Sequence, residues 1–155
     1  MNILYDLSVW YSDINDYSKA IELAREVYEK RKETLGIDNP DTLKSLSTLE
    51  NYYITVENYT EAIKLETIVY TIIKNTLGEN NPYTLNSLST LASYYYSKNY
   101  NKALELEKIV CEKRISIFGK EHPDTLDELQ NLSMIYEKLG NKTETKKLEK
   151  ILNKN

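Results

Sequence analysis

Apolar residues recur along this chain at spacings of three and four, which is the spacing of one face of an α-helix. Leu46, Leu49 and Tyr53 follow this pattern, and a second stripe begins at Ala62 and continues to Val69. Stripes of these two kinds alternate from one end of the chain to the other. They predict eight helices, over residues 2–14, 17–34, 41–56, 59–76, 83–98, 100–117, 124–138 and 141–153.

A short linker recurs three times between these predicted helices. It places a glycine four residues before each of Pro40, Pro82 and Pro123, after Leu or Phe. Glycine just past a helix allows a left-handed backbone that ends it, and Asn before a proline caps the next helix. The chain is therefore four copies of one two-helix repeat, over residues of about 1–36, 37–78, 79–119 and 120–155.

The second helix of each of the first three repeats carries an alanine at the same position, namely Ala20, Ala62 or Ala103. A small side chain there lets the paired helices approach closely, so we expect these alanines to be buried. One helix pair cannot bury its apolar stripe alone, and about three stacked repeats are needed for stability. We therefore predict an all-α fold, an α-solenoid of four helix pairs.

The linker Leu-Gly-x-x-(His/Asn)-Pro-Asp-Thr-Leu, together with Leu-x-x-Leu-x-x-x-Tyr and Tyr-x-x-Ala, resembles the 42-residue tetratricopeptide repeat of kinesin light chains. The resemblance covers essentially the whole chain. It implies a right-handed superhelix whose first helices line a concave groove for peptide segments of partner proteins. No heptad coiled coil accompanies the repeats, so a motor role is not implied.

Aromatic residues that recur at equivalent positions are explained most simply by stacking between helices. Two sets recur on the first helices: Tyr11, Tyr53, Tyr95 and Tyr136 form one, and Trp10, Tyr52, Tyr94 and Ile135 form the other. We expect both sets to be packed rather than to bind a ligand.

The face of each first helix opposite its partner helix is the candidate groove. It is rich in small hydroxyl and amide side chains, which can hydrogen-bond an extended peptide backbone. Tyr5 and Tyr96 are not repeated aromatics, so we expect them to be the binding anchors. The candidate residues are Tyr5, Val9, Lys44, Ser47, Thr48, Asn51, Asn86, Ser89, Thr90, Ser93, Tyr96, Gln130, Asn131 and Met134. A merely solvated face is the alternative.

Receptors of this fold that clamp a terminal carboxylate use several Lys, Arg and Asn residues on the groove face. Here the face offers only Lys44, Asn51 and the distant Asn131, and no Arg lies on it. A carboxylate clamp is therefore not expected.

The composition limits the remaining possibilities. The chain has 155 residues with a net charge of −4, which is too acidic for a surface that tracks nucleic-acid phosphates. One Cys and one His rule out an internal disulfide and most metal sites. No apolar run approaches the roughly 18 residues of a membrane span, and the start is not signal-like. We expect a cytoplasmic protein without a cofactor that does not contact membranes.

Catalytic candidates are weak. His122 stands where Asn39 and Asn81 stand, so we interpret it as a helix-start residue. Cys111 has no paired His. The carboxylates form no recurrent inward pair, and we expect most of them on outer faces. We therefore predict that the chain is not an enzyme; an inward His, Cys or carboxylate pair would be needed to change that.

The two ends differ from the middle. Lysines spaced four residues apart form a ladder on the last helix: Lys142, Lys146, Lys150 and Lys154. A polar capping face explains it, and a basic dock for an acidic partner or for nucleic acid is the alternative. Helix 2–14 has no preceding repeat to cover Tyr5, Val9 and neighbouring apolar surface, so we expect self-association through the N-terminal repeat.

The predicted function is a protein-interaction scaffold that binds peptide segments of a partner protein in the groove. A self-associating structural module, or the repeat portion of a larger signalling protein, is the first alternative. A regulatory domain of an enzyme is the second.

Overall fold

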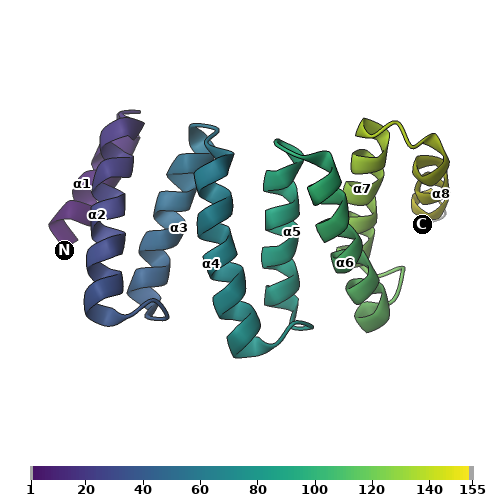
Figure 1. The fold of residues 1–155 in the computed structure, drawn as a ribbon, viewed down its shortest axis with the longest axis horizontal. Coiled ribbons are helices and arrows are strands. Elements are labelled where there is room, and N and C mark those ends of the chain that lie inside the picture. The colour runs from purple at the N-terminus through teal and green to yellow at the C-terminus, as the bar shows by residue number, and fades with distance from the viewer. Residues whose placement is uncertain (1, 154–155) are drawn as a thin grey trace. The chain divides into compact units, whose positions relative to one another are not determined.

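The structure is a computed structural model that describes residues 2–153. Over that range α-helices joined by short turns are the regular secondary structure, and every predicted helix end lies within two residues of the observed one. The helices are α1 (Asn2–Asp13), α2 (Tyr17–Leu35), α3 (Pro40–Thr55), α4 (Tyr59–Leu77), α5 (Pro82–Tyr96), α6 (Tyr100–Phe118), α7 (Pro123–Lys138) and α8 (Lys142–Leu152) (Figure 1). The predicted all-α fold of four helix pairs is confirmed; the handedness of a superhelix stays a prediction. None of these helices is long and apolar enough to cross a membrane.

The linkers between helix pairs end and start helices as the sequence predicts. Gly36 closes α2 with a φ of 88°, a backbone angle that a residue with a Cβ rarely adopts. At the start of α3, the backbone N–H of Asp41 donates to the Asn39 side chain at 2.9 Å. At the start of α7, the N–H of Asp124 donates to Nδ1 of His122 at 3.2 Å. His122 is therefore a helix cap, as expected.

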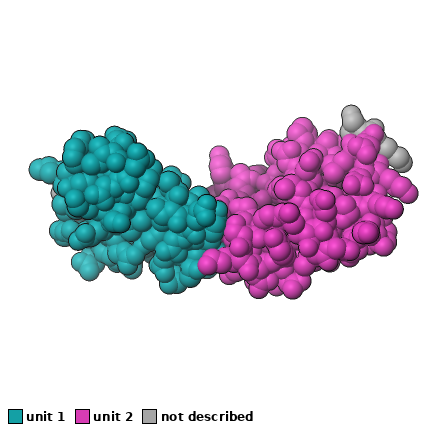
Figure 2. Space-filling model, turned by 90° about the horizontal axis from the view of Figure 1, so that it is seen from above, with its two compact units in different colours: residues 1–72 teal, residues 73–155 magenta. Residues whose placement is uncertain are grey.

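The chain divides into two compact units, Met1–Ile72 and Ile73–Asn155, which Figure 2 colours separately. In unit 1, α2 packs against both α1 and α3. In unit 2, α5 packs against α6, α6 against α7, and α7 against α8. Within each unit, the second helix of one repeat thus covers the first helix of the next repeat.

Close packing within the helix pairs depends on the recurrent alanines. Ala20, Ala62 and Ala103 are each 0% exposed, which confirms the prediction that they are buried. In unit 2, Leu129 and Leu132 pack in a core cluster together with other apolar residues of α6, α7 and α8. These cores hold the first helices in place and leave their opposite faces accessible.

One expected packing position is wrong. Trp10 was expected to pack like its equivalents Tyr52 and Ile135, yet it is 53% exposed while Tyr52 is 7% exposed. Tyr52 of α3 lies edge-on against Tyr17 of α2, with ring centroids 6.3 Å apart. Among the described residues, no helix takes that place beside α1, so Trp10 lacks the partner that buries its equivalents.

The exposed apolar surface of α1 also differs in detail from the expectation. Tyr5 and Val9 are half-buried rather than open. The exposed apolar residues are Ile3, Leu7, Trp10 and Ile14, which are spaced along one helical face.

Candidate functional site

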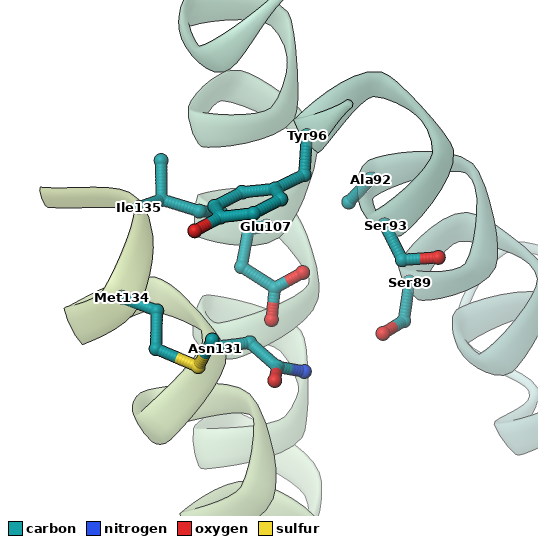
Figure 3. A pocket seen from close by; sticks show the side chains of 8 residues that line it. All are labelled: Ser89, Ala92, Ser93, Tyr96, Glu107, Asn131, Met134 and Ile135. Atoms are coloured by element: carbon teal, nitrogen blue, oxygen red, sulfur yellow. The ribbon is translucent and has the colours of Figure 1, made fainter. Parts of the chain in front are cut away.

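A cavity of about 150 Å³ lies in unit 2 among α5, α6 and α7. It is lined by Ser89, Ala92, Ser93, Tyr96, Glu107, Asn131, Met134 and Ile135 (Figure 3). Five of these residues are sequence-predicted groove residues, contributed by the first helices α5 and α7. Sequence reasoning missed Glu107 because it comes from the second helix α6, which was assigned to packing.

Glu107 is an acidic side chain that is buried inside unit 2. It is 1% exposed, and its Oε1 atom has no hydrogen-bond partner among the described residues. Its carboxyl points into the space between Asn131 and Ser89 (Figure 3). Burial, followed by a hydrogen bond with Glu128 and the charge of Glu128, raises the pKa of Glu107 to about 9. Glu107 therefore carries a proton at neutral pH.

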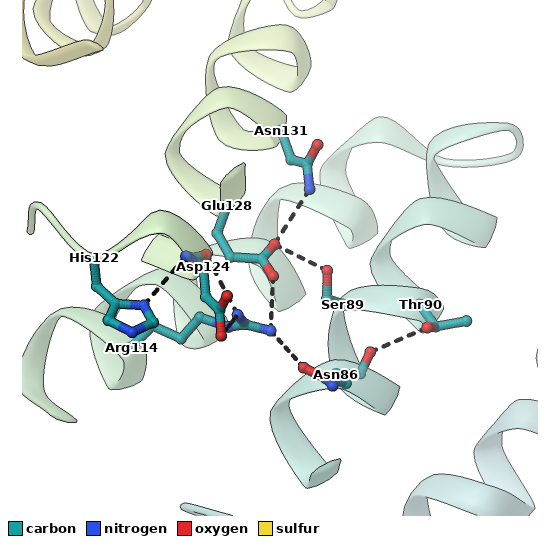
Figure 4. Close-up of polar contacts among 8 residues, drawn as sticks. All are labelled: Asn86, Ser89, Thr90, Arg114, His122, Asp124, Glu128 and Asn131. Carbon is teal, nitrogen blue, oxygen red and sulfur yellow. Dashed lines mark hydrogen bonds and ion pairs between the residues drawn. The ribbon is translucent and has the colours of Figure 1, made fainter. Parts of the chain in front are cut away.

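Glu128 of α7 is also buried, but its carboxylate is well partnered (Figure 4). Arg114 of α6 approaches its Oε1 atom through Nη2 at 3.1 Å. Ser89 of α5 and Asn131 of α7 donate to its Oε2 atom, at 2.9 and 3.2 Å. Glu128 thus connects all three helices around the cavity. We call Glu107 and Glu128 the acidic pair.

Arg114 is itself buried, and both of its terminal nitrogens are engaged, whereas its Nε atom has no hydrogen-bond partner among the described residues. Its Nη2 donates to Oδ1 of Asn86 at 2.7 Å, besides the contact with Glu128. Its Nη1 lies 3.3 Å from the Asp124 carbonyl oxygen and 3.4 Å from the Asp124 carboxylate. The positive charge of the guanidinium group is therefore balanced by these oxygen atoms. Arg114 does not line the cavity.

Unit 1 has the same arginine in a different setting. Arg31 of α2 is equivalent to Arg114, and it too is buried. Its Nη1 donates to the Asp41 carbonyl oxygen at 3.0 Å and to the Ser45 hydroxyl at 2.6 Å. Ser45 stands where Glu128 stands, and Ala24 stands where Glu107 stands. Unit 1 therefore lacks the acidic pair at its α2–α3 contact.

The predicted groove residues of unit 1 gather around Tyr5. The Tyr5 hydroxyl lies 3.4 Å from the Thr48 hydroxyl. The Lys44 ammonium and the Arg31 guanidinium lie over the ring, 5.5 and 5.4 Å from its centroid. Tyr5 is therefore already engaged with two cations. Of the other predicted residues, Val9 is half-buried, whereas Ser47 and Asn51 are exposed.

Three predicted residues of unit 2 do not line the cavity. Asn86 is held by Arg114, and the Thr90 hydroxyl donates to the Asn86 backbone carbonyl at 3.1 Å. Gln130 is exposed on α7. The expectation that no Arg lies on the groove face considered the first helices alone, whereas Arg31 and Arg114 reach the groove residues Tyr5 and Asn86 from the second helices.

The expectation that carboxylates lie on outer faces is wrong for the acidic pair. The sequence held a partial signal: Glu128 replaces the Ser45 and Ser87 of earlier repeats, whereas the position of Glu107 holds Ala24 in the first repeat and the buried Glu66 in the second. Only the change at Glu128 puts a charged group at a position that is otherwise small and uncharged. Such departures are informative because the repeat itself does not require them.

The remaining candidate groups do not form a reactive site. Cys111 is buried, and burial raises the pKa of its thiol, which keeps it protonated. In the described part of the chain, no group of His, Cys, Asp and Glu side chains could hold a metal ion. Lys142, Lys146 and Lys150 of the lysine ladder are exposed on α8, and Lys154 lies outside the described residues.

Solved structures with the same arrangement of helices are available. One is a protein from Podosopora anserina, described as a kinesin light chain with nearly identical TPR-like repeats; it is 26% identical, with a TM-score of 0.72. That match covers 97% of this chain and 72% of the other. BtubC (BKLC) from P. vanneervenii is 16% identical with a TM-score of 0.73, over 97% of this chain and 62% of the other.

The apo form of RapI is 16% identical with a TM-score of 0.65, over 99% of this chain and 56% of the other. At this identity, RapI and BtubC establish only the shared fold. No curated protein matches the sequence.

The family comparison agrees with the motifs. The tetratricopeptide repeat model matches residues 1–41 and 84–124, which together are more than half of the chain. The two matched segments contain the equivalent residues Arg31 and Arg114. The chain therefore belongs to the tetratricopeptide repeat family, and its repeats are of the kinesin light chain type.

Proposed function

We propose that the chain is a scaffold that binds peptide segments of partner proteins along the first helices of its repeats. The tetratricopeptide fold serves protein–protein interaction in general. The observation that carries the finer proposal is the cavity of unit 2, because five residues chosen from the sequence as groove residues line it. Their chemistry suits a peptide: Ser89, Ser93 and Asn131 offer hydrogen bonds, and Tyr96 and Met134 offer apolar contact.

The test begins with a peptide selected by the full chain from a displayed random library. The dissociation constant of that peptide is then measured for the wild type and for Tyr96→Ala. We expect a loss of about 2 kcal/mol, or about 30-fold, because a half-buried aromatic anchor is removed. The melting temperature should change little, because Ser12, Ile54 and Glu137 occupy the equivalent positions in other repeats.

The lysine ladder provides the matched control. Replacing Lys142, Lys146 and Lys150 together by Ala removes exposed charge from α8, so it should alter only the salt dependence of binding. Asn51→Ala should cost about 1 kcal/mol if the peptide also occupies unit 1, because one backbone hydrogen bond is lost. Loss of binding in the ladder variant with full binding in Tyr96→Ala and Asn51→Ala would refute the groove as the site.

The acidic pair bears on the possibility that the chain is an enzyme. An inward carboxylate pair is the feature that would favour an enzyme, and the sequence alone did not reveal it. Three contacts with Arg114, Ser89 and Asn131 occupy Glu128. The residues that line the cavity include no His, Lys or Cys that could activate Ser89 or Ser93 as a nucleophile. Members of the family are typically not enzymes. Binding therefore explains the cavity better than catalysis, and the cytoplasmic location stays a prediction.

Self-association through the N-terminal repeat is a second candidate, which the exposed face of α1 favours. Leu7 and Trp10 are exposed there. Their equivalents Leu49 and Tyr52, on α3, are buried in the helix stack of unit 1. An apolar helix face of this kind commonly marks an interaction surface.

Trp10 is the single tryptophan of the chain and reports directly on that face. Association should make the weight-average mass rise with concentration in light scattering and shift the Trp10 emission to shorter wavelength. Leu7→Lys should abolish both effects without loss of helicity, because it places a charge on the exposed face. A strict monomer at high micromolar concentration would contradict this second candidate.

A further inference from the structure

The side chains that line the cavity of unit 2 include an acid and no base. Glu107 is the acidic residue in the lining of the cavity. Its Oε1 atom is buried and has no hydrogen-bond partner among the described residues. The nearest cation, Arg114, is bound to Glu128, Asn86 and Asp124. An anion entering the cavity would therefore face the acidic pair with no free positive charge to hold it. Anionic ligands are disfavoured.

A cation finds complementary groups in the same space. The Tyr96 ring and the Glu107 carboxyl border the cavity together (Figure 3). An aromatic face attracts an ammonium or guanidinium group, and a buried carboxylate forms a strong charge-assisted hydrogen bond with it. Met134 and Ile135 supply the apolar wall along which the methylene stem of a long basic side chain can lie.

The volume restricts the ligand to one side chain. A cavity of about 150 Å³ is the size that accommodates a single benzene-sized group. A nucleotide or a folded cofactor is too large for it. The cavity therefore suits the end of one residue in a longer chain.

We propose that this cavity receives a lysine or arginine side chain of a bound peptide, with the Glu107 carboxylate as its counter-ion and the Tyr96 ring as its cover. This inference rests on the proposed function, because it names the partner chemistry for the peptide site of unit 2. The equivalent positions in unit 1 are Ala24 and the buried Glu66, and what distinguishes Glu107 is that it lines the cavity with an unpartnered Oε1 atom.

Binding of a cation should displace the proton of Glu107. The charged groups that act on Glu107 are Glu128 of α7 and Arg114 of α6, and Tyr96 of α5 is the other titratable group in the lining. The neighbouring Cys111 stays protonated. A cation favours the ionised carboxyl, so the complex holds fewer protons than the free protein. Affinity should consequently rise with pH, by up to about tenfold per pH unit between pH 6 and 8.

The cavity can be tested without any peptide. Met134 lines it and is one of two methionines in the chain, so its ¹³C-labelled methyl group gives an NMR signal that is simple to assign. The probes are n-butylammonium, n-butanol and butyrate at equal ionic strength. We expect n-butylammonium to shift the Met134 signal in a saturable way and the other two probes to have at least tenfold weaker effects.

The peptide arm uses acetyl-Ala-Ser-X-Ser-Ala-amide with X as Arg, Lys, norleucine or Glu. We expect the Arg and Lys peptides to bind at least tenfold more tightly than the norleucine and Glu peptides. Glu107→Gln should remove this preference and its pH dependence, because the amide keeps the shape but cannot ionise. The matched control is Glu112→Gln, which makes the same charge change at an exposed position of α6.

The two arms separate the two ideas. Equal binding of the norleucine and Lys peptides, or a preference for Glu, overturns the basic-side-chain inference and leaves peptide binding intact. A saturable n-butylammonium shift that Glu107→Gln abolishes, with no binding of any peptide, supports the cation cavity and counts against the proposed function. Absence of a Met134 response to every probe overturns the inference, as does retention of the Arg and Lys preference in Glu107→Gln.

Discussion

In unit 1 the guanidinium of Arg31 reaches from α2 to the start of α3, and in unit 2 that of Arg114 reaches from α6 to the start of α7. Both arginines contact the backbone carbonyl of an equivalent aspartate, Asp41 or Asp124. The further acceptor differs, because Arg31 meets a serine hydroxyl and Arg114 meets the Glu128 carboxylate. Only in unit 2 is this acceptor accompanied by a buried second acid.

This difference separates what the repeat needs from what one repeat adds. Ala24 and Ser45 show that the contact between consecutive repeats forms without carboxylates. Burying Glu107 beside Glu128 is unfavourable for folding, because a buried carboxyl loses hydration and faces a like charge. A buried Glu at the Glu107 position recurs as Glu66, but the α2–α3 contact has no such pair of acids. A costly pair that this contact does without is a reasonable marker of function, and its member Glu107 borders the cavity.

The largest expected difference between the units follows from removal of the two arginines. Arg114→Met leaves Glu128 buried without its cation, so we expect a loss of about 3–5 kcal/mol in the free energy of unfolding. Arg31→Met should cost about 1–3 kcal/mol, because the Ser45 hydroxyl still donates to the Asp41 carbonyl oxygen. Urea unfolding measures both, and amide hydrogen exchange shows which unit is loosened. Equal costs in the two variants would contradict the comparison.

The recurrent alanines should respond alike in both units, in contrast to the arginines. Ala62→Leu and Ala103→Leu each force a larger side chain into a fully buried position between paired helices. We expect each to lower the free energy of unfolding by about 1–3 kcal/mol through overpacking. Thermal melts provide the measurement. Melting temperatures that stay at the wild-type value in both variants would refute the packing scheme.

A pH effect should come from unit 2. The folded pKa of Glu107 is about 9, above its ordinary value of 4.5, so between these values the folded chain holds a proton that the unfolded chain has released. The stabilisation by this proton is fully present below about pH 4.5 and is lost as pH rises through 9. The free energy of unfolding should therefore fall with rising pH, by up to about 1.4 kcal/mol per pH unit.

Urea midpoints measured at pH 5, 6, 7 and 8 test this effect. Glu107→Gln should flatten the dependence, because the amide stays neutral throughout, whereas Glu112→Gln should retain it. The same slope in wild type and Glu107→Gln would show that Glu107 does not hold a proton in the folded chain.

Much of the fold follows from the sequence because the same helix-forming and helix-ending motifs recur in three or four repeats. Helix ends, the His122 cap and the buried alanines are all set by local rules that act within one repeat. The prediction for Trp10 was wrong because burial at this position requires a neighbouring helix. Treating Trp10 as equivalent to Tyr52 assumed that such a helix covers it. Local pattern fixes each helix pair but not what covers it.

The candidate site was predictable only in part. Tyr96 and Asn131 were found because they lie on the exposed faces of first helices. Glu107 and Arg114 were missed because they reach the site from a second helix, and long side chains extend beyond the face on which their helix position places them. Subtracting the repeat would have marked Glu128, which departs from Ser45 and Ser87, but not Glu107, because Glu66 stands at the same position in the second repeat.

The central claim is that the acidic pair serves binding rather than stability. The most direct test replaces the acidic pair by the residues of the α2–α3 contact, Ala24 and Ser45, in the double variant Glu107→Ala/Glu128→Ser. This variant is titrated with the Arg peptide while the Met134 methyl signal is observed. The account predicts that the chain folds with a melting temperature no lower than that of the wild type and that the peptide binds at least tenfold more weakly. Wild-type affinity in the double variant would contradict the account.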